Sequence, residues 1–439
     1  GLSLSLLDFQ MVNNKFNHHI IDESLFNESF EFAKHVFPFH RSISGKGIND
    51  AFAILNNEIG GVLHQYPTGT KVFDWIVPPE WECLNLSINK LTNDGILGKT
   101  LIELDHPLRV ASHSIGFKGI LTGSELLKHL VISRKYPNNL THRYLYYEND
   151  WQVTCKVSEY ESIDLEGKYF VDLDCRKYPG TLKVHEKRLG SLYAPVIYFL
   201  SHLCHPAQFN DGLIGVLLNV YLVKYMKKHM SDLRYCYSFL AFPETIGSHA
   251  YCSEPKNLKN GLFAIFCEMV GLDQPIHIQK SKSTDDYVNQ LIYIALNESG
   301  LSGKFSEFLK VIRNDEKVFN APGINIPSAS ITRALGPGID DHPFRGYHSD
   351  LDNIENSDIS KFKEVVILYQ VLIYVIENDF KVERCYAGLP MLSRHNLFVD
   401  PLKDRDGYNI REALMHALEK DQKISDLSIN LSTSFKDIL

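Results

Sequence analysis

The sequence lacks any apolar run of the roughly 18–20 residues that a membrane-spanning helix needs, because Lys, Asn or Asp interrupts its longest apolar segments. The short apolar run at the N-terminus follows no basic segment, and Asp8 comes soon after it, so we do not expect a secretory signal. The eight cysteines are scattered without a C-x-x-C pair, as is typical of reduced thiols. These absences predict a cytoplasmic protein with no membrane segment.

Other absences exclude classes of function. The net charge of -8 and the pI near 6.2 argue against a nucleic-acid-binding protein. The sequence contains no G-x-S-x-G nucleophile motif and no phosphate-binding glycine loop. It also has no H-E-x-x-H zinc motif, since the segment from His185 to Leu189 lacks the second histidine. Internal repeats and low-complexity tracts are absent too.

What the sequence does contain indicates a large α/β protein. Its 439 residues exceed one compact domain, and 44% hydrophobic with 22% charged residues is ordinary for a globular chain. The apolar spacing over 23–66 predicts two helices separated by a Gly/Ser turn at 41–47. Short apolar runs over 72–155 predict a small β-rich module. After Tyr169, strands alternate with helices, which predicts an α/β sheet with helices on its faces.

Polar residues follow the predicted strands of this sheet. His202 and His205 come at the end of one strand and Asp211 at the start of the next helix, Glu244 follows a second strand, and Glu268 ends a third. A later loop adds His348, Asp350 and Asp352. Active sites in open α/β sheets lie at the carboxyl ends of the strands, and zinc accepts imidazole together with carboxylate. The pattern therefore predicts a metal centre.

Each of these residues also has a purely structural interpretation. Asp211 is placed as a helix N-cap, Glu244 faces a helix dipole, and Glu268 fits a buried salt bridge. Cys204, between two histidines, raises the alternative of a thiol nucleophile, but nothing orients a base toward it. The joint arrangement within an α/β rhythm favours the metal centre.

The order of these motifs resembles the co-catalytic zinc aminopeptidase family. Asn210–Gly215 is similar to its N-D-x-x-x-G motif, Glu244–Ser248 to E-E-x-G, Cys267–Gly271 to the strand-end acid, and Tyr347–Asp352 to Y-H-T-x-x-D. The segments 315–319 and 323–327 are similar to its S-D-H-x-x-F and G-I-P elements. The resemblance implies that Asp211 bridges metals and that Glu244 is the general base.

The sequence resembles more closely an aminopeptidase-like subfamily found among bacterial polysaccharide-biosynthesis genes. The shared elements are the C-H-P…N-D signature at Cys204–Pro206 and Asn210–Asp211, the Phe73–Trp81 segment that opens a β-rich insert, and Pro390–Phe398. The implied fold class is α/β: a zinc-aminopeptidase-like mixed sheet flanked by helices, with an inserted small β-rich domain and a C-terminal winged-helix-like domain. The expected units are 1–71, the start of the aminopeptidase-like domain; 72–155, the insert; 156–387, its metal-binding part; and 388–439, the winged helix.

The resemblance also implies a site. The metal ligands are His205, Asp211, Glu268 and His348, with Asp350 or Asp352 orienting His348 and with His202 as the second choice for the first ligand. Two departures stand out: Thr245 replaces the second glutamate of E-E, and H-x-D has no clean counterpart. We therefore expect one tightly held zinc ion, or a second one held weakly.

Two functions follow as hypotheses. The first is a zinc-dependent hydrolase acting on a small peptide, aminoacyl or amidated-sugar substrate, in which Asp315 and Glu316 either bind a substrate ammonium or pair with Lys317 and Arg313. The second is a non-catalytic binding or regulatory protein on the same fold, whose tail contacts a partner. The tail is acidic to neutral, which favours protein over nucleic acid as that partner. The oligomeric state is not predicted.

Overall fold

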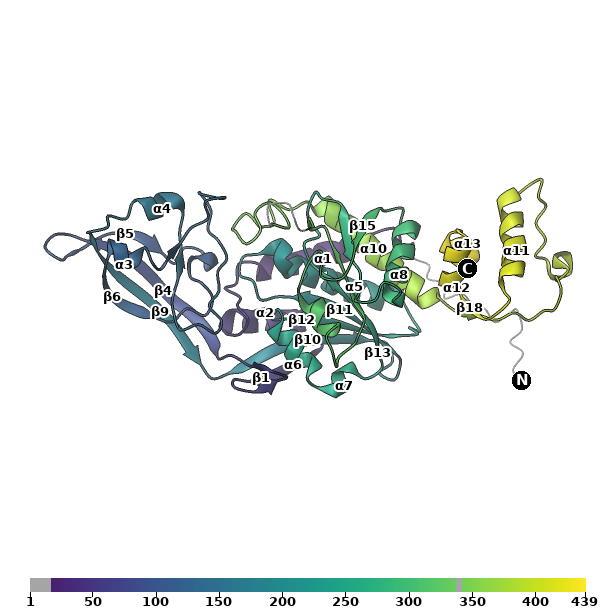
Figure 1. Ribbon diagram of the computed structural model, residues 1–439, viewed down its shortest axis with the longest axis horizontal. Helices are drawn as coiled ribbons and strands as arrows, with labels where there is room; N and C mark the ends of the chain where they lie inside the picture. Colours follow the sequence, from purple (N-terminus) through teal and green to yellow (C-terminus); the bar gives the residue numbers. More distant parts are fainter. Residues whose placement is uncertain (1–16, 337–341) are drawn as a thin grey trace.

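The computed structural model describes residues 17–336 and 342–439, so the N-terminal apolar run lies outside the described residues. The molecule is elongated, with a β-rich module at one end, a large α/β body in the middle and a small helical part at the other end (Figure 1). The predicted fold class is confirmed for the body, which is a mixed sheet flanked by helices.

The body is built on one eight-stranded mixed sheet. Its order is β1 (Val62–Pro67), β10 (Thr181–Leu189), β12 (Cys236–Phe242), β11 (Val196–His202), β13 (Gly261–Cys267), β16 (Ser328–Thr332), β14 (Ile276–Gln279) and β15 (Gly303–Ser306). Strands β12, β11, β13 and β16 run parallel, whereas β10 and β14 join them antiparallel. Every residue of β11 and β12 is buried, as expected for parallel strands covered on both faces.

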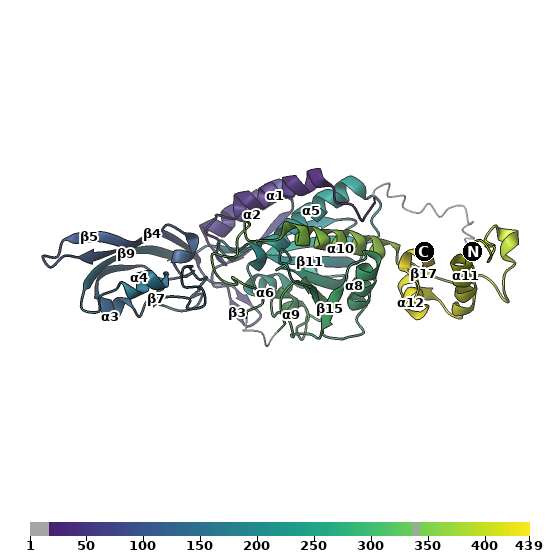
Figure 2. The same cartoon turned by 90° about the horizontal axis from the view of Figure 1, so that it is seen from above.

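Helices cover both faces of this sheet. Figure 2 shows α1 (Glu23–Val36), α2 (Lys46–Ile59) and α5 (Ile214–His229) along one side, and α6 (Ile246–Cys252) and α9 (Asp315–Phe319) along the other. The remaining helices of the body are α7 (Pro255–Leu258), α8 (Tyr287–Glu298) and α10 (Ile359–Asn378). Their apolar residues and those of the sheet form one continuous core.

The β-rich module has a separate four-stranded antiparallel sheet in the order β5 (Leu97–Glu103), β4 (Glu80–Leu91), β9 (Lys168–Tyr178) and β6 (Phe117–Thr122). It has its own core, which contains Trp81 and Trp151. Because β9 pairs with β4 along its whole length, this sheet continues beyond residue 155, the expected end of the insert. We refer to residues 80–178 as the β-rich module.

Short elements complete the module and the C-terminal part. In the module these are η1 (Pro107–Arg109), α3 (Gly123–Leu126), β7 (Leu130–Val131), β8 (Val153–Thr154) and α4 (Val157–Glu161). The hairpin of β2 (Lys71–Val72) and β3 (Trp75–Ile76) packs on the body: Val72 lies in the core of the body, and the ring of Trp75 stacks on His249 of α6. The C-terminal part contains β17 (Lys381–Val382), η3 (Leu392–His395), α11 (Arg405–Ala417), β18 (Gln422–Lys423), α12 (Ile424–Asn430) and α13 (Phe435–Ile438). The winged-helix assignment stays a prediction.

The described residues bear on two expectations, which concern membrane-spanning helices and the state of the cysteines. None of their helices combines the length and the apolar character that crossing a bilayer requires. All eight cysteines are free thiols.

Candidate metal centre

The carboxyl ends of three adjacent parallel strands bring the predicted site together. His202 is the last residue of β11, Glu268 follows β13 directly, and Glu244 lies two residues after β12. Asp211 comes from η2 (Phe209–Leu213), the irregular turn before α5, and His348 from the loop between β16 and α10. Residues more than a hundred positions apart therefore meet at one edge of the sheet, as the strand-end pattern predicts.

The carboxylate of Asp211 lies at the centre of this cluster. Its Oδ1 is 3.3 Å from Nε2 of His202, and its Oδ2 is 2.9 Å from Nε2 of His348 and 4.0 Å from Nε2 of His205. Nε2 of His202 also contacts Oε2 of Glu268 at 2.7 Å. Two groups of ligand atoms thus share one carboxylate: an inner group of His202, Asp211 and Glu268, and an outer group of His205, Asp211 and His348.

The two candidates for the first histidine ligand therefore both reach the site. The signature places His205 in the outer group, and His202, the second choice, stands in the inner group on the other oxygen of Asp211. The sequence presents these histidines as alternatives, whereas the structure gives each its own position. Which of them binds a metal ion stays a prediction.

Glu244 lies beside the outer group and faces outward. Its Oε2 is 3.3 Å from Nε2 of His205, and its side chain is 28% exposed, whereas the side chains of the inner group are at most 3% exposed. The backbone N–H of Glu244 donates to Sγ of Cys204 at 3.1 Å. A carboxylate held at the solvent side of a buried histidine and aspartate cluster is suitably placed to exchange protons with a bound molecule.

The turn that carries Asp211 is held from two sides. The carboxylate of Asp352 accepts hydrogen bonds from the backbone N–H groups of Asn210, at 2.8 Å, and of Asp211, at 3.0 Å. A Cβ on Gly215 would lie 2.1 Å from the carbonyl oxygen of Cys267, so only glycine lets α5 approach β13 this closely. The glycine of the N-D-x-x-x-G motif is thereby explained by packing.

The electrostatics of the cluster follow from its burial. Burial raises the pKa of the Glu244 carboxyl to about 7, and the nearby Asp211 carboxylate adds to this rise. Burial lowers the pKa of His205 to about 3, which leaves a neutral imidazole at neutral pH. Burial also disfavours the ionised Asp211 carboxylate, but the imidazoles of His205, His202 and His348 hold its pKa well below the usual range.

These donors fit a divalent cation such as zinc. Zinc binds imidazole nitrogen and carboxylate oxygen, and three protein ligands with one open position are typical of catalytic sites. Oδ2 of Asp211 and Nε2 of His348 are buried, and neither makes a hydrogen bond of acceptable geometry to the described residues, although they lie 2.9 Å apart. A cation between them satisfies both. In the inner group, a metal ion would replace the proton that His202 and Glu268 share.

Asp315 and Glu316, which the sequence leaves open to bind a substrate ammonium or to pair with Lys317 and Arg313, are fully buried at the start of α9. The carboxylate of Asp315 accepts hydrogen bonds from the backbone N–H of Thr245 at 2.8 Å and from Oγ of Ser248 at 2.5 Å. Glu316 accepts from the backbone N–H of Asn314 and from the side chain of Gln279. Asp315 therefore fixes the turn after Glu244, and both carboxylates bind protein donors.

The resemblance implies that Asp350 or Asp352 orients His348. Asp352 contacts the backbone of the Asp211 turn instead, as described above. The backbone N–H of Asp350 donates to the carbonyl oxygen of Leu140 at 3.1 Å, which ties the His348 loop to the β-rich module. Asp352 thus acts through its carboxylate, whereas Asp350 makes its contact through the backbone.

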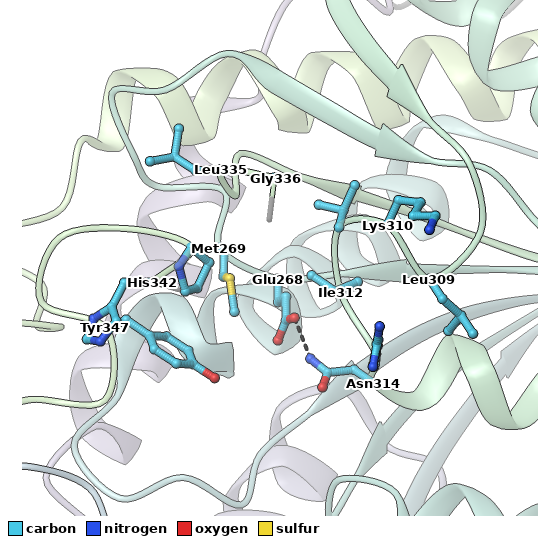
Figure 3. A pocket seen from close by; sticks show the side chains of 13 residues that line it. Glu268, Met269, Leu309, Lys310, Ile312, Asn314, Leu335, Gly336, His342 and Tyr347 are labelled. Carbon is cyan, nitrogen blue, oxygen red and sulfur yellow. Dashed lines mark hydrogen bonds between the residues drawn. The ribbon is translucent and has the colours of Figure 1, made fainter. Parts of the chain in front are cut away.

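A cavity of about 380 Å³ opens beside the inner group. Figure 3 shows Glu268 at its floor, bonded to the side chain of Asn314, with Tyr347 and Met269 on one side and Ile312 and Lys310 on the other. Its lining is mixed: apolar side chains such as Met269 and Leu335 lie beside the polar or charged ones of Glu268, Lys310, Arg313 and Asn314.

Sequence reasoning missed two residues of the site. Tyr347 stacks on the ring of His348, with ring centroids 3.9 Å apart. His142, from the β-rich module, packs its ring against His205 and His348, with centroids 4.7 and 5.1 Å away. The only local signal for His142 is the dense aromatic stretch T-H-R-Y-L-Y-Y at 141–147.

Comparison with known proteins assigns the chain to a family. The model of a domain of unknown function (DUF4910) matches residues 30–379, most of the chain. The chain belongs to this family. The matched DUF4910 region includes the whole eight-stranded sheet, the β-rich module and every residue of the candidate metal centre.

Individual relatives agree with this assignment. A Clostridium acetobutylicum protein named "Putative polysaccharide biosynthesis protein with aminopeptidase-like domain" is 27% identical over 380 residues, which are 84% of this chain and 83% of that protein. The crystal structure of a "putative peptidase" from Clostridium acetobutylicum aligns over 96% of both chains with a TM-score of 0.83 and 24% identity. A zinc aminopeptidase from Bacillus subtilis aligns over 81% of this chain and 94% of its own, with a TM-score of 0.56 and 12% identity.

These likenesses confirm the predicted resemblance at the level of fold. This DUF4910 chain has a zinc-aminopeptidase-like body, as the order of its motifs predicts. At such low identity the structural neighbours show the fold alone. The chemistry is therefore argued from the residues of the site.

Proposed function

We propose that the chain is a zinc-dependent, aminopeptidase-like hydrolase that cleaves an amide or peptide bond of a small substrate. The observation that carries this proposal is the position of Glu244, a partly exposed carboxylate 3.3 Å from His205, beside an aspartate shared by two groups of ligand atoms. A site that only binds a metal ion has no need of a free carboxylate at this position.

The residues that would hold zinc are those of the inner and outer groups. Zinc at such a site supplies an acidified water molecule and a polarised scissile carbonyl. Glu244 takes a proton from the attacking water through Oε2 and passes it to the leaving nitrogen. A carboxyl with a pKa of about 7 is well matched to this task at neutral pH. Asp315 and Ser248 hold the turn that carries this base.

The cavity beside Glu268 supports a small substrate. Its volume of about 380 Å³ is enough for an amino-acid side chain or a sugar ring but not for a folded protein. The name of the Clostridium acetobutylicum relative refers to polysaccharide biosynthesis, so aminoacyl and amidated sugars belong among the first substrates to test, beside small peptides.

Glu244→Gln is the variant that tests this function. We expect it to retain the bound zinc of the wild type while hydrolysis falls by about 10²–10⁴-fold, because only the proton transfer is removed. Glu254→Gln, a charge-neutralising change outside the cluster, serves as the matched control and should keep full activity. Equal rates for Glu244→Gln and wild type on every cleaved substrate would refute the assigned base.

One observation favours a second candidate, a binding protein without catalysis. Thr245 stands where the resemblance leads us to expect a second ligand glutamate. This candidate predicts that zinc-loaded wild-type protein binds aminoacyl or peptide ligands but does not hydrolyse them. Calorimetric titration followed by mass spectrometry of the recovered ligand distinguishes the two candidates.

A further inference from the structure

The outer group of the metal centre lies against the β-rich module. Residues 140–142 of the module run beside residues 348–350, with Thr141 and Ser349 forming an antiparallel bridge. The backbone N–H of His142 and the hydroxyl of Thr141 both donate to the carbonyl oxygen of His348, at 2.7 and 3.0 Å. The loop that carries His348 is therefore fixed in place by the module.

This pairing brings the side chain of His142 into the centre. The residue is 3% exposed, and its ring packs on His205 and at right angles to His348. Its Nε2 is buried and has no hydrogen-bond partner among the described residues. A buried polar nitrogen without a partner is destabilising, so an unpartnered atom at this point requires an explanation.

The groups around His142 indicate a partner for its Nε2 atom. Its ring contacts the imidazoles of His205 and His348, two members of the outer group, whose third member is the carboxylate of Asp211. Imidazole nitrogen and carboxylate oxygen are donors that zinc accepts, so a further imidazole beside the outer group suits this metal ion.

We propose that His142 is a further ligand of the outer metal position, supplied by the β-rich module. This inference rests on the proposed function, since it presumes a metal ion at that position. It also addresses the departure at Thr245: a ligand that the motif leads us to expect from the turn after β12 is replaced by an imidazole from a different part of the chain. The active site is then assembled from the body and the module together.

The test uses the full chain, stripped with a chelator and reloaded with Zn²⁺ or Co²⁺ alone. We expect His142→Ala to lower the affinity of the outer ion by more than about 100-fold, beyond the 10–100-fold that the loss of an indirect partner causes. The inner ion should remain. The visible absorption of the Co²⁺ protein should change, because the coordination number of the outer ion falls.

Two further variants keep the test decisive if His142→Ala folds poorly. His142→Cys places a thiolate at the same point, and a new sulfur-to-cobalt charge-transfer band, absent from wild type, is expected only if residue 142 touches the ion. His113→Ala is the matched control: it removes another buried histidine of the module, one whose nitrogens already contact Ser42 and Pro79. It should leave the metal content and the Co²⁺ spectrum unchanged.

The outcomes separate this inference from the proposed function. If His142→Ala keeps the wild-type affinities and His142→Cys shows no new band, while wild type binds zinc and hydrolyses substrate, His142 is not a ligand and the hydrolase stands. If wild type binds no metal ion after reloading, the inference and the proposed function both fail.

Discussion

The carboxylate of Asp352 accepts the backbone N–H of Asp211 at 3.0 Å, and through this bond a loop near the end of the body sets the orientation of the central carboxylate of the site. The same carboxylate accepts the backbone and side-chain N–H groups of Asn210. Asp352 therefore acts on the metal centre without touching any of its proposed histidine ligands.

We predict that Asp352→Asn weakens zinc binding by about 10–100-fold, the usual effect of losing an indirect partner of a ligand. The amide loses one of the two acceptor oxygens that hold the turn. Competition with a chelator of known affinity measures the change. Asp358→Asn is the control, because Asp358 caps α10 through the N–H of Lys361 and should affect helix stability but not zinc. Equal zinc affinities for the two variants would contradict the prediction.

Removal of the metal ion should destabilise the fold. The centre holds buried carboxylates and imidazoles that a cation satisfies, and a ligand present at 1,000 times its Kd adds about 4 kcal/mol to the free energy of unfolding. We expect a chelator to lower the Tm and added zinc to restore it. Asp211→Asn, which alters both groups of ligand atoms, should show a low Tm that zinc does not raise. A Tm of wild type that is indifferent to zinc would argue against the site.

Gly215→Ala tests the packing that positions Asp211. In an exposed helix this change is stabilising by up to about 1 kcal/mol. Here the new Cβ would lie 2.1 Å from the carbonyl oxygen of Cys267, in a central strand that cannot move aside. We expect the clash to outweigh the gain in helix propensity and to lower the free energy of unfolding by about 1–3 kcal/mol. Gly119→Ala, where the nearest atom is a ring carbon of Phe117 at 3.3 Å, should cost much less. Denaturant titration compares them.

The stability of the body should also depend on pH through Glu186. The residue is buried and bonded to His64, Ser238 and Arg188, which hold the pKa of its carboxyl at about 2 despite the opposing effect of burial. A folded-state pKa below the unfolded value of 4.5 means that this stabilisation is complete above about pH 4.5 and is lost as the pH falls toward 2.

Glu186→Gln should accordingly unfold more easily than wild type at pH 7, by about 3 kcal/mol, and the difference should shrink as the pH falls from 4.5 to 2. Unfolding curves in urea at a series of pH values measure this. Glu31→Gln, on the surface of α1, is the control and should show no such trend. A pH-independent difference for Glu186→Gln would show that its hydrogen bonds matter but its charge does not.

The sequence predicts the body well because its signals are local. Fully apolar strands followed by polar residues mark both the sheet and its active edge, so His202, Glu244 and Glu268 are found at the strand ends of β11, β12 and β13. The helix expected to start at Asp211 begins at Ile214, because the turn that carries Asp211 is irregular up to Leu213.

The rest of the site depends on tertiary contacts that produce no periodic pattern in the sequence. The approach of Leu140–His142 to residues 348–350 joins segments some two hundred positions apart, and neither carries a motif for the other. The histidines at 202 and 205 look like competitors in the sequence, since only the side-chain geometry shows that they face different oxygens of Asp211. The sequence likewise does not show that β9 extends the small sheet. The alternating residues of β9 fit either sheet, and only the pairing of β9 with β4 decides between them.

If both groups of ligand atoms hold an ion under the proposed function, the carboxylate that they share makes loading of the two positions a linked equilibrium. An ion at one position would fix the rotamer of Asp211 and withdraw charge from it, and so would change the affinity of the other position. Thermodynamic reciprocity requires the second ion to alter the affinity of the first by the same factor. Zinc uptake by two such positions would then be described by three constants, two for the separate positions and one for their cooperativity.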